Sequence, residues 1–300
     1  MMRKPDVSII SLNYNGFELT SAMIESLKRN VSLDFELIIV DNASREDEAA
    51  MLRDRYPELK LVRSDKNLGF AGGNNLGIRE ATGRYLFFLN NDTELEDDSL
   101  RYLVERMDSD PSIGVVCPKI RFFYGERLIQ FAGYTPLSKI SLRNSLIGFK
   151  CKDDGSFDQS CDSPYAHGAA MMVRREVLDT AGLMNEKYFL YYEELDWSER
   201  IRKAGWRIVY EPRCCVFHKE SATTGQESPL RTYYITRNRL LFASRNLKGA
   251  DLWLSLAYQI LLVAPAKALG FLLKGRVKLA KAMIKGVVDF VTMDKECAWL

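Results

Sequence analysis

A run of three polar residues, Asn90-Asn91-Asp92, directly follows an apolar stretch, Tyr85–Leu89, that predicts a buried strand. A carboxylate at the end of such a strand can bind a divalent cation, because Mg²⁺ and Mn²⁺ prefer oxygen ligands. Asp92 is the strongest candidate ligand, with a side-chain oxygen of Asn90 as a second. His218 could complete this metal site, although a lone histidine is more often structural and a plain turn would also explain the three residues.

A second acidic segment lies about a hundred residues later, where Glu193, Glu194 and Asp196 precede Trp197. Neighbouring acids raise one another's pKa, which suits a general base. The ordinary alternative is a solvated helix start, since the helix dipole favours acids there. The sequence does not decide between Glu194 and Glu193 as the base.

We expect Asn67–Gly77, which is rich in glycine and asparagine, to be a loop that runs into a helix, and it fits neither the dinucleotide fingerprint nor the P-loop. Small residues before a helix start would let backbone N–H groups approach a phosphate. Asn67 and Asn74 could add side-chain contacts. A flexible turn is the alternative.

The first 120 residues alternate between strand and helix patterns. The predicted strands are Val7–Leu12, Glu36–Asp41, Leu59–Arg63 and Tyr85–Leu89, and the predicted helices are Glu18–Arg29 and Glu46–Arg55, the latter capped by Ser44. This order predicts an α/β fold with a doubly wound, mainly parallel sheet. Ligands of such sheets bind beyond the carboxyl ends of the strands, where Asn13, Asp41, Asn67 and Asp92 fall.

The middle of the chain is less regular. Its predicted elements are the strands Gly114–Phe123, His167–Val173, Trp206–Tyr210 and Cys214–Phe217, and a helix Glu194–Ala204 ended by Gly205. Residues 125–164 are polar and irregular, which predicts a mobile or acceptor-facing region.

The last quarter of the chain is apolar and basic. Residues 231–285 contain eleven Lys or Arg and a single acid, Asp251. Residues 252–273 are long enough to cross a bilayer, but Pro265 and Lys267 argue against a simple span, because a charge there costs roughly 3 kcal/mol. Apolar residues at 277, 280, 284, 287 and 291 alternate with lysines at 278, 281 and 285, as in an amphipathic helix. We expect helices lying on an anionic membrane surface; packing on the catalytic domain or on a partner subunit is the alternative.

Composition limits the class of protein. The net charge of +2 gives no indication of a nucleic-acid partner. Six cysteines show no disulfide framework, and the first residues lack the apolar run of a signal peptide. We therefore expect a protein at the cytoplasmic face of the cell membrane.

Taken together, these segments resemble the family 2 glycosyltransferases, which have the GT-A fold, over roughly residues 5–245. The stretches that carry the resemblance are Val7–Gly16, Ile38–Ser44, Asn67–Gly77, Leu86–Thr93, His167–Val173, Tyr188–Ala204, Val216–His218 and Tyr233–Phe242. The form Gly69-Phe-Ala-Gly-Gly-Asn74 is most similar to the rhamnosyltransferase-like branch.

The resemblance implies a role for each candidate. A nucleotide-sugar pocket would be lined by Asn13, Asp41, Asn67, Gly69, Phe70, Asn74 and Asn91, with Asp41 on the nucleobase. Asp92 and His218, with Asn90, would hold Mg²⁺ or Mn²⁺; Glu194 would be the catalytic base, Glu193 its fallback, and Asp196 and Trp197 would shape the acceptor site. One departure matters, because Asn90 stands where the family commonly has the first acid of a D-x-D motif.

We therefore expect a catalytic domain over residues 1–228, with a nucleotide-sugar half to about residue 120, followed by a membrane-associating helical region over 229–300. The expected reaction is the inverting transfer of a sugar from a dTDP- or UDP-sugar to a hydroxyl of a glycan or lipid-linked acceptor. The first candidate for the donor is dTDP-rhamnose. One alternative function is that of a sugar-nucleotide nucleotidyltransferase, which would require a basic glycine-rich loop after the first strand. The other is a catalytically degenerate scaffold that binds the donor without turnover.

Overall fold

The computed structural model of the chain describes residues 5–219 and 228–293. Three segments lie outside the described residues. They are residues 1–4 and 294–300, at the ends of the two expected regions, and residues 220–227, where those regions join. The strands are β1 (Val7–Asn13), β2 (Phe35–Asp41), β3 (Lys60–Arg63), β4 (Tyr85–Leu89), β5 (Thr93–Glu94), β6 (Ile113–Phe122), β7 (Ile129–Phe131), β8 (Cys161–Asp162), β9 (Ala170–Arg174) and β10 (Arg207–His218). The α-helices are α1 (Phe17–Asn30), α2 (Glu48–Arg55), α3 (Gly69–Glu80), α4 (Arg101–Ser109), α5 (Val177–Ala181), α6 (Glu193–Lys203), α7 (Pro229–Asn246), α8 (Gly249–Ala257), α9 (Ala264–Leu273) and α10 (Val277–Thr292). A 3₁₀ turn, η1 (Glu186–Tyr188), precedes α6, and a π-helical stretch, η2 (Tyr258–Val263), joins α8 to α9.

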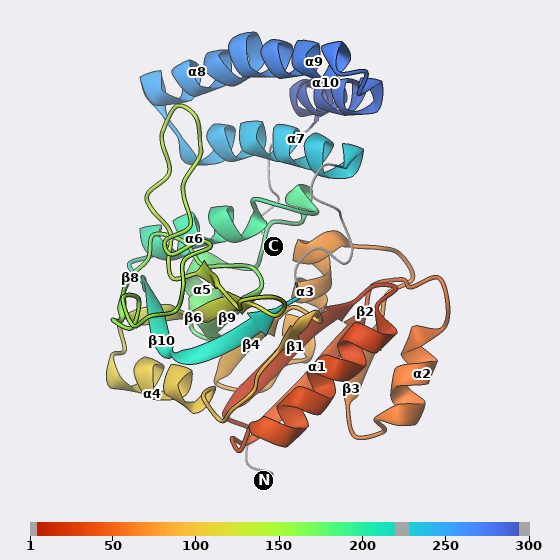
Figure 1. Cartoon of the computed structure of the whole chain (residues 1–300), viewed down its shortest axis with the longest axis vertical. Helices are drawn as coiled ribbons and strands as arrows, with labels where there is room; N and C mark the ends of the chain where they lie inside the picture. The colour runs from red at the N-terminus through yellow and green to blue at the C-terminus, as the bar shows by residue number, and fades with distance from the viewer. Residues whose placement is uncertain (1–4, 220–227, 294–300) are drawn as a thin grey trace.

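One mixed sheet forms the centre of the molecule, in the order β3-β2-β1-β4-β9-β6-β10-β5 (Figure 1). The first four strands pair in parallel, β9 runs antiparallel between β4 and β6, and β10 is parallel to β6. The predicted α/β class and the mainly parallel sheet are confirmed. The carboxyl ends of β1, β2, β4 and β10 therefore meet at one edge of the sheet, which faces α6 and α7 in Figure 1.

The glycine-rich segment is a helix rather than a loop, which corrects our expectation. Helix α3 takes in nearly the whole segment, starting at Gly69. Its glycines allow close packing on the sheet, since a Cβ at Gly77 would lie 2.5 Å from Ile10 Cγ2 and one at Gly73 would lie 3.0 Å from the Leu12 methyl groups. Burial against β1 thus outweighs the poor helix propensity of glycine.

Two other local expectations are wrong. Helix α2 begins at Glu48, and its cap is Asp47, whose side chain accepts from the N–H of Ala50 at 3.1 Å. Ser44, the expected cap, instead donates its hydroxyl to Asp41 at 2.6 Å. The two short strands expected at 206–210 and 214–217 are the single strand β10, whose pairing with β6 shifts register between 211 and 215.

The irregular middle region, expected to be mobile or acceptor-facing, forms a long loop that rises from the sheet to the C-terminal helices (Figure 1). Its two arms pair at Tyr134 and Leu146, and Thr135 N donates to the Ser145 carbonyl at 3.0 Å. The tip is bound by α8 and η2, because Ser255 Oγ and Gln259 Nε2 donate to the Ile140 carbonyl at 3.0 and 3.2 Å. The loop therefore ties the sheet to the C-terminal layer.

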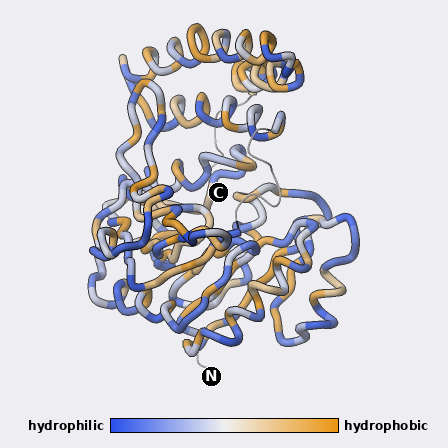
Figure 2. Tube along the Cα trace, in the orientation of Figure 1, coloured by the Kyte–Doolittle hydropathy of each residue, from blue (hydrophilic) through white to orange (hydrophobic). Residues whose placement is uncertain are grey.

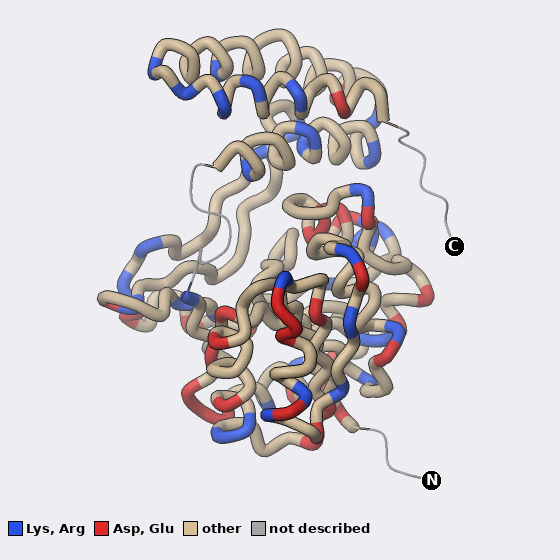
Figure 3. Tube along the Cα trace, turned by 90° about the vertical axis from the view of Figure 1, so that its right-hand side faces the viewer, with Lys and Arg blue, Asp and Glu red and all other residues tan. Residues whose placement is uncertain are grey.

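The C-terminal layer consists of α7, on which α10 packs, and of α8, η2 and α9, which run as one long helix above α7 (Figure 1). Figure 2 shows hydrophobic residues recurring along this upper helix as well as in the strands of the sheet. Lys and Arg prevail over acids in the layer, whereas Asp and Glu gather in the lower part of the molecule (Figure 3).

The amphipathic helix predicted after residue 277 exists as α10, but its packing face differs from the expected one. The buried face consists of Leu279, Ala280, Met283, Gly286 and Phe290. Gly286 permits the contact, since a Cβ there would lie 2.8 Å from the Tyr233 carbonyl oxygen of α7. The expected apolar residues at 277, 284 and 291 are exposed, as are the lysines at 281 and 285, so apolar and basic groups share the outer face.

Candidate active site

Asp92 and His218 come together at the carboxyl edge of the sheet. Asp92 follows β4, His218 ends β10, and His218 Nε2 lies 3.1 Å from Asp92 Oδ1. Both side chains are buried. The short strand β5 fixes this approach, because Thr93 pairs with His218.

Gln130, which the sequence analysis missed, orients His218. Its Oε1 lies 2.8 Å from His218 Nδ1. Because an amide oxygen only accepts hydrogen bonds, Nδ1 carries the proton in this contact, and in neutral His218 the Nε2 lone pair faces Asp92. Second-sphere contacts of this kind fix the tautomer of metal-binding histidines.

The donor set fits a divalent cation that also binds a diphosphate. The described residues contain no group of three or more His, Cys, Asp or Glu that could hold a metal on their own. Mg²⁺ is usually held by one or two protein ligands, with substrate phosphates and water completing the shell, and the Asp92–His218 pair matches that number. The backbone of Asn90 is held in place, with its N–H bonded to the Ala169 carbonyl at 2.9 Å and its carbonyl accepting from Thr93 Oγ1 at 2.6 Å.

Three of the predicted nucleotide-binding residues belong to one buried network below the ends of β1 and β2. Asn13 Nδ2 donates to Asp41 Oδ1 at 2.8 Å. Thr20 Oγ1 donates to Asn13 Oδ1 at 2.7 Å and accepts from Asn91 Nδ2 at 2.9 Å. Asp41 is fully buried and also accepts from Ser44. These residues therefore form one hydrogen-bond network that extends to Asn91, the residue before Asp92.

The remaining predicted nucleotide-binding residues lie at the start of α3. Asn67 Oδ1 accepts from the N–H of Gly69 at 2.8 Å, and Phe70 N donates to the Phe189 carbonyl at 2.6 Å. Gly69 has a φ of +69°, and a Cβ there would lie 2.2 Å from the Phe189 carbonyl oxygen, so only glycine fits. Asn74 donates to the Phe70 carbonyl at 2.9 Å within its own helix. Two of the first N–H groups of α3 already have partners, which weakens the expected phosphate contact at this helix start.

Glu193 and Glu194 begin α6, and each has one carboxylate oxygen without a hydrogen-bond partner among the described residues. Among the described residues, no hydrogen-bond donor reaches the Oε2 atom of either glutamate. Burial raises the pKa of Glu194 to about 7. Burial and the charge of Glu194 raise the pKa of Glu193 well above its usual range. Glu193 is 4% exposed whereas Glu194 is half-buried, so Glu194 is the more accessible of the two.

Small and aromatic residues surround Glu194. A Cβ at Gly168 would lie 3.9 Å from Glu194 Cγ and 3.7 Å from Phe70 Cζ, so the glycine leaves room between these side chains. The charge of Glu194, after burial, contributes to the raised pKa of Tyr134, which places that phenol nearby. Tyr134 stacks on His167, with ring centroids 6.0 Å apart.

His167 stacks on Tyr134 and lies near His218 of the candidate metal pair. Burial, and then the charge of His218, lower its pKa to about 3, so His167 is neutral. Its Nδ1 accepts from the N–H of Ala169 at 3.1 Å. Neither His167 nor Tyr134 nor Gln130 was singled out from the sequence; an aromatic residue within the polar 125–164 region was the only available signal.

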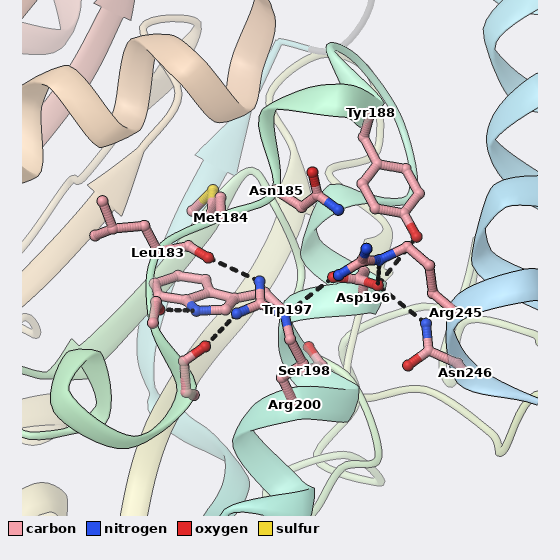
Figure 4. A network of polar contacts seen from close by, with 12 residues as sticks. Leu183, Met184, Asn185, Tyr188, Asp196, Trp197, Ser198, Arg200, Arg245 and Asn246 are labelled. Atoms are coloured by element: carbon pink, nitrogen blue, oxygen red, sulfur yellow. Dashed lines mark hydrogen bonds and ion pairs between the residues drawn. The ribbon is translucent and has the colours of Figure 1, made fainter. Parts of the chain in front are cut away.

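Asp196 and Trp197 lie inside the protein rather than at an acceptor site (Figure 4). Asp196 is 1% exposed and accepts four hydrogen bonds, from Tyr188, Arg200, Arg245 and Asn246. Trp197 packs edge-on against Phe88 and donates to the Gly182 carbonyl at 2.8 Å. Asp196 therefore joins α6 to α7.

This sheet order, with an Asp–His pair at its carboxyl edge, agrees with the GT-A glycosyltransferase fold that the sequence resemblance implies. Residues 8–182, more than half of the chain, match the model of glycosyl transferase family 2. The chain belongs to this family.

Relatives and a solved structure agree with this membership. The chain is 28% identical over 243 residues to the low-salt glycan biosynthesis hexosyltransferase Agl10 of Haloferax volcanii, covering 79% of this chain and 75% of Agl10. It is 22% identical over 238 residues to N-acetylglucosaminyl-diphospho-decaprenol L-rhamnosyltransferase of Mycobacterium tuberculosis, covering 73% and 78% of the two chains. The mannosyltransferase PcManGT of Pyrobaculum calidifontis, solved with GDP-Man and Mn²⁺, superposes with a TM-score of 0.58 at 16% identity, covering 97% of this chain and 88% of that one. The expected family and fold are thus confirmed, and the nucleotidyltransferase alternative is set aside.

Proposed function

We propose that this family 2 enzyme transfers a hexose or 6-deoxyhexose from a nucleoside diphosphate to a hydroxyl of a lipid-linked glycan. Rhamnose is our first candidate for the sugar, and the transfer inverts the anomeric carbon. The observation that carries the proposal is Glu194, whose oxygen Oε2 lacks a donor among the described residues and whose pKa is about 7. A carboxylate of that pKa can accept a proton at neutral pH. One named relative is a hexosyltransferase of glycan biosynthesis, and the other is named for N-acetylglucosaminyl-diphospho-decaprenol, which supports the acceptor class.

The chemistry follows from the placement of these residues. Glu194 takes the proton of the acceptor hydroxyl, the acceptor oxygen bonds to the anomeric carbon, and the bond from that carbon to the phosphate oxygen breaks. The nucleoside diphosphate leaves with the bonding electron pair, and no covalent enzyme intermediate is needed. The network of Asn13, Asp41 and Asn91, with Gly69 and Phe70, would hold the nucleotide.

Asp92 and His218 would hold Mg²⁺ or Mn²⁺, with Asn90 in reach of its shell. When bound, the cation neutralises the charge that grows on the departing diphosphate. Gln130 keeps the Nε2 lone pair of His218 directed to this site.

We place the enzyme at the cytoplasmic face of a membrane, and the apolar and basic C-terminal layer supports the membrane attachment. One helix, Gly249–Leu273, is long and apolar enough to cross a bilayer, and only 17% of its most apolar window is buried. This helix runs along α7 rather than away from it (Figure 1), which favours a helix lying in the interface over one that spans.

A donor screen tests the proposed activity. The full chain, purified in detergent, is mixed with UDP-, dTDP- and GDP-sugars with and without Mn²⁺, beside Asp92→Ala and Glu194→Gln variants. We expect Mn²⁺-dependent binding of one donor, lost in Asp92→Ala, and slow hydrolysis lost in Glu194→Gln. Failure to bind any donor would overturn the proposal, and tight binding without turnover, even with membrane lipid supplied as acceptor, would show a degenerate scaffold.

A further inference from the structure

A cavity of about 150 Å³ lies within the C-terminal layer, between α7, η2, α9 and α10. Three cationic residues line it, Arg231 and Arg239 from α7 and Lys267 from α9. Among the described residues that line it there is no Asp or Glu. Apolar side chains, among them Ile235, Val263, Phe271 and Met283, make up much of the wall.

The acids of this layer are engaged elsewhere. Within the described residues 228–293 there are two, and Asp251 pairs with Lys139 at 2.9 Å while Asp289 binds Tyr233 at 2.6 Å and also Lys285. Partial burial, and then the charges of Arg143 and Arg239, lower the pKa of Lys267. Lys267 thus lies near other cations, and an anion in the cavity would relieve the repulsion between them.

Arg239 connects the cavity to the start of α6, the helix that carries the proposed base. Its Nε donates to the Tyr192 hydroxyl at 2.7 Å. Tyr192 is the N-cap residue that precedes α6, and the next two residues are Glu193 and Glu194. The cavity is therefore separated from the proposed base by the side chain of one residue and a short step along the backbone.

Helix α9 has an apolar outer face opposite the cavity. Ala264, Lys267 and Phe271 line the cavity at helical spacing. Leu262, near the end of η2, and Leu269 of α9 are 62% and 57% exposed, and their seven-residue spacing places them on one outer face of the continuous helix. The helix thus offers basic groups to an anion on one side and apolar surface to acyl or prenyl chains on the other.

We propose that this cavity binds the diphosphate group of a lipid-linked sugar acceptor, so that the sugar attached to the diphosphate reaches Glu194. The inference rests on the proposed glycosyl transfer and names the acceptor class of the same site. Arg and Lys side chains bind phosphate oxygens through charge-assisted hydrogen bonds, and the apolar wall accommodates the first carbons of the lipid.

The test compares two acceptors that carry the same sugar. One has the sugar on a short prenyl diphosphate, and the other is its uncharged alkyl glycoside of similar length. The Lys267→Glu variant should lower the selectivity for the diphosphate acceptor, as a ratio of kcat/KM values, at least tenfold. Lys267→Arg, which keeps the charge, should retain the selectivity, as should the control Lys274→Gln, whose lysine is exposed in the same layer but does not line the cavity.

Binding of the prenyl diphosphate sugar to full-length protein in detergent, followed by calorimetry, gives a readout that needs no turnover. Weaker binding by Lys267→Glu supports the cavity even if no donor is found, in which case only the proposed transfer fails. Unchanged binding and unchanged selectivity in Lys267→Glu would overturn the inference. Vesicles with and without phosphatidylglycerol test whether the cavity binds a phospholipid headgroup instead of the acceptor diphosphate. If Lys267→Glu loses vesicle binding but keeps its acceptor selectivity, the cavity binds bulk phospholipid and the inference is wrong.

Discussion

The side-chain amide of Asn238 donates to the backbone carbonyl of Tyr191 at 2.7 Å, and it also reaches the carbonyls of Tyr188 and Leu190. Asn238 is fully buried in α7. The segment that it holds is strained, since Phe189, Tyr191 and Tyr192 have φ values of 63°, 70° and 76°. This segment leads directly into Glu193 and Glu194, so α7 fixes the direction from which the proposed base enters the site.

Replacing Asn238 with alanine should lower both stability and turnover. The change leaves backbone carbonyls without their donor, at a cost of about 1–3 kcal/mol in the free energy of unfolding. We expect kcat to fall about tenfold or more while the Kd for the donor stays near that of the wild type, because Asn13, Asp41 and Asn91 of the proposed nucleotide pocket are held by a separate network. Thermal unfolding and single-turnover kinetics measure the two effects. Ser244→Ala, which removes a local bond to Leu241 in the same helix, is the control, and a folded Asn238→Ala with full kcat would contradict the positioning role.

The activity should rise with pH around neutrality. The proton-accepting form of Glu194 is the carboxylate, and burial raises its pKa to about 7. The acidic limb of kcat against pH should therefore bend near pH 7, and Glu194→Gln should lose at least a hundredfold in kcat. Initial rates between pH 5 and 9 test this. If the limb bends near pH 4.5, or if Glu193→Gln is the more damaging change, Glu194 is not the base.

The same shift has the opposite effect on stability. Because the folded-state pKa of Glu194 lies above that of the unfolded chain, the folded state keeps its proton to higher pH, and stability is lost as pH rises from about 4.5 to about 7. Glu194→Gln removes that loss. At pH 8 the variant should be more stable than the wild type by about 1–3 kcal/mol, and at pH 4.5 the difference should nearly vanish. Urea unfolding at the two pH values measures it, and equal differences at both would show that burial does not perturb this carboxylate.

Gln130 should affect metal affinity without contacting the metal. It holds His218 Nδ1 at 2.8 Å, and loss of such second-sphere partners typically weakens metal binding about 10–100-fold. Gln130→Ala should shift the Mn²⁺ concentration needed for half-maximal donor binding upward by that factor, with saturating Mn²⁺ restoring the binding. Gln159→Ala, at an exposed position, should leave the titration unchanged. An unaltered Mn²⁺ dependence in Gln130→Ala would remove His218 from the metal site.

Residues adjacent to regular strands could be placed from the sequence, whereas those brought in by long-range packing could not. The strand Tyr85–Leu89 and the acid after it were predictable because a fully apolar run ends at a polar turn. The segment Gly69–Gly77 was misassigned because helix propensity is local, while the contacts of Gly73 and Gly77 with β1 are tertiary. Gln130 and Asn238 gave no local signal, since their partners lie 88 and about 50 residues away.

The outer face of the C-terminal layer should bind membranes through its apolar residues. Leu262 and Leu269 are exposed on one face, and each should contribute about 1–2 kcal/mol when buried in the interface. The double variant Leu262→Gln/Leu269→Gln should therefore bind vesicles at least tenfold more weakly in sedimentation. Met51→Gln, an exposed apolar position on α2 of the catalytic domain, is the matched control. Raising phosphatidylglycerol should strengthen binding of the wild type, and salt should weaken it, because basic residues such as Lys281 lie on the same layer. Unchanged vesicle binding by the double variant, together with a wild-type dimer that the variant loses, would assign this face to a partner subunit instead.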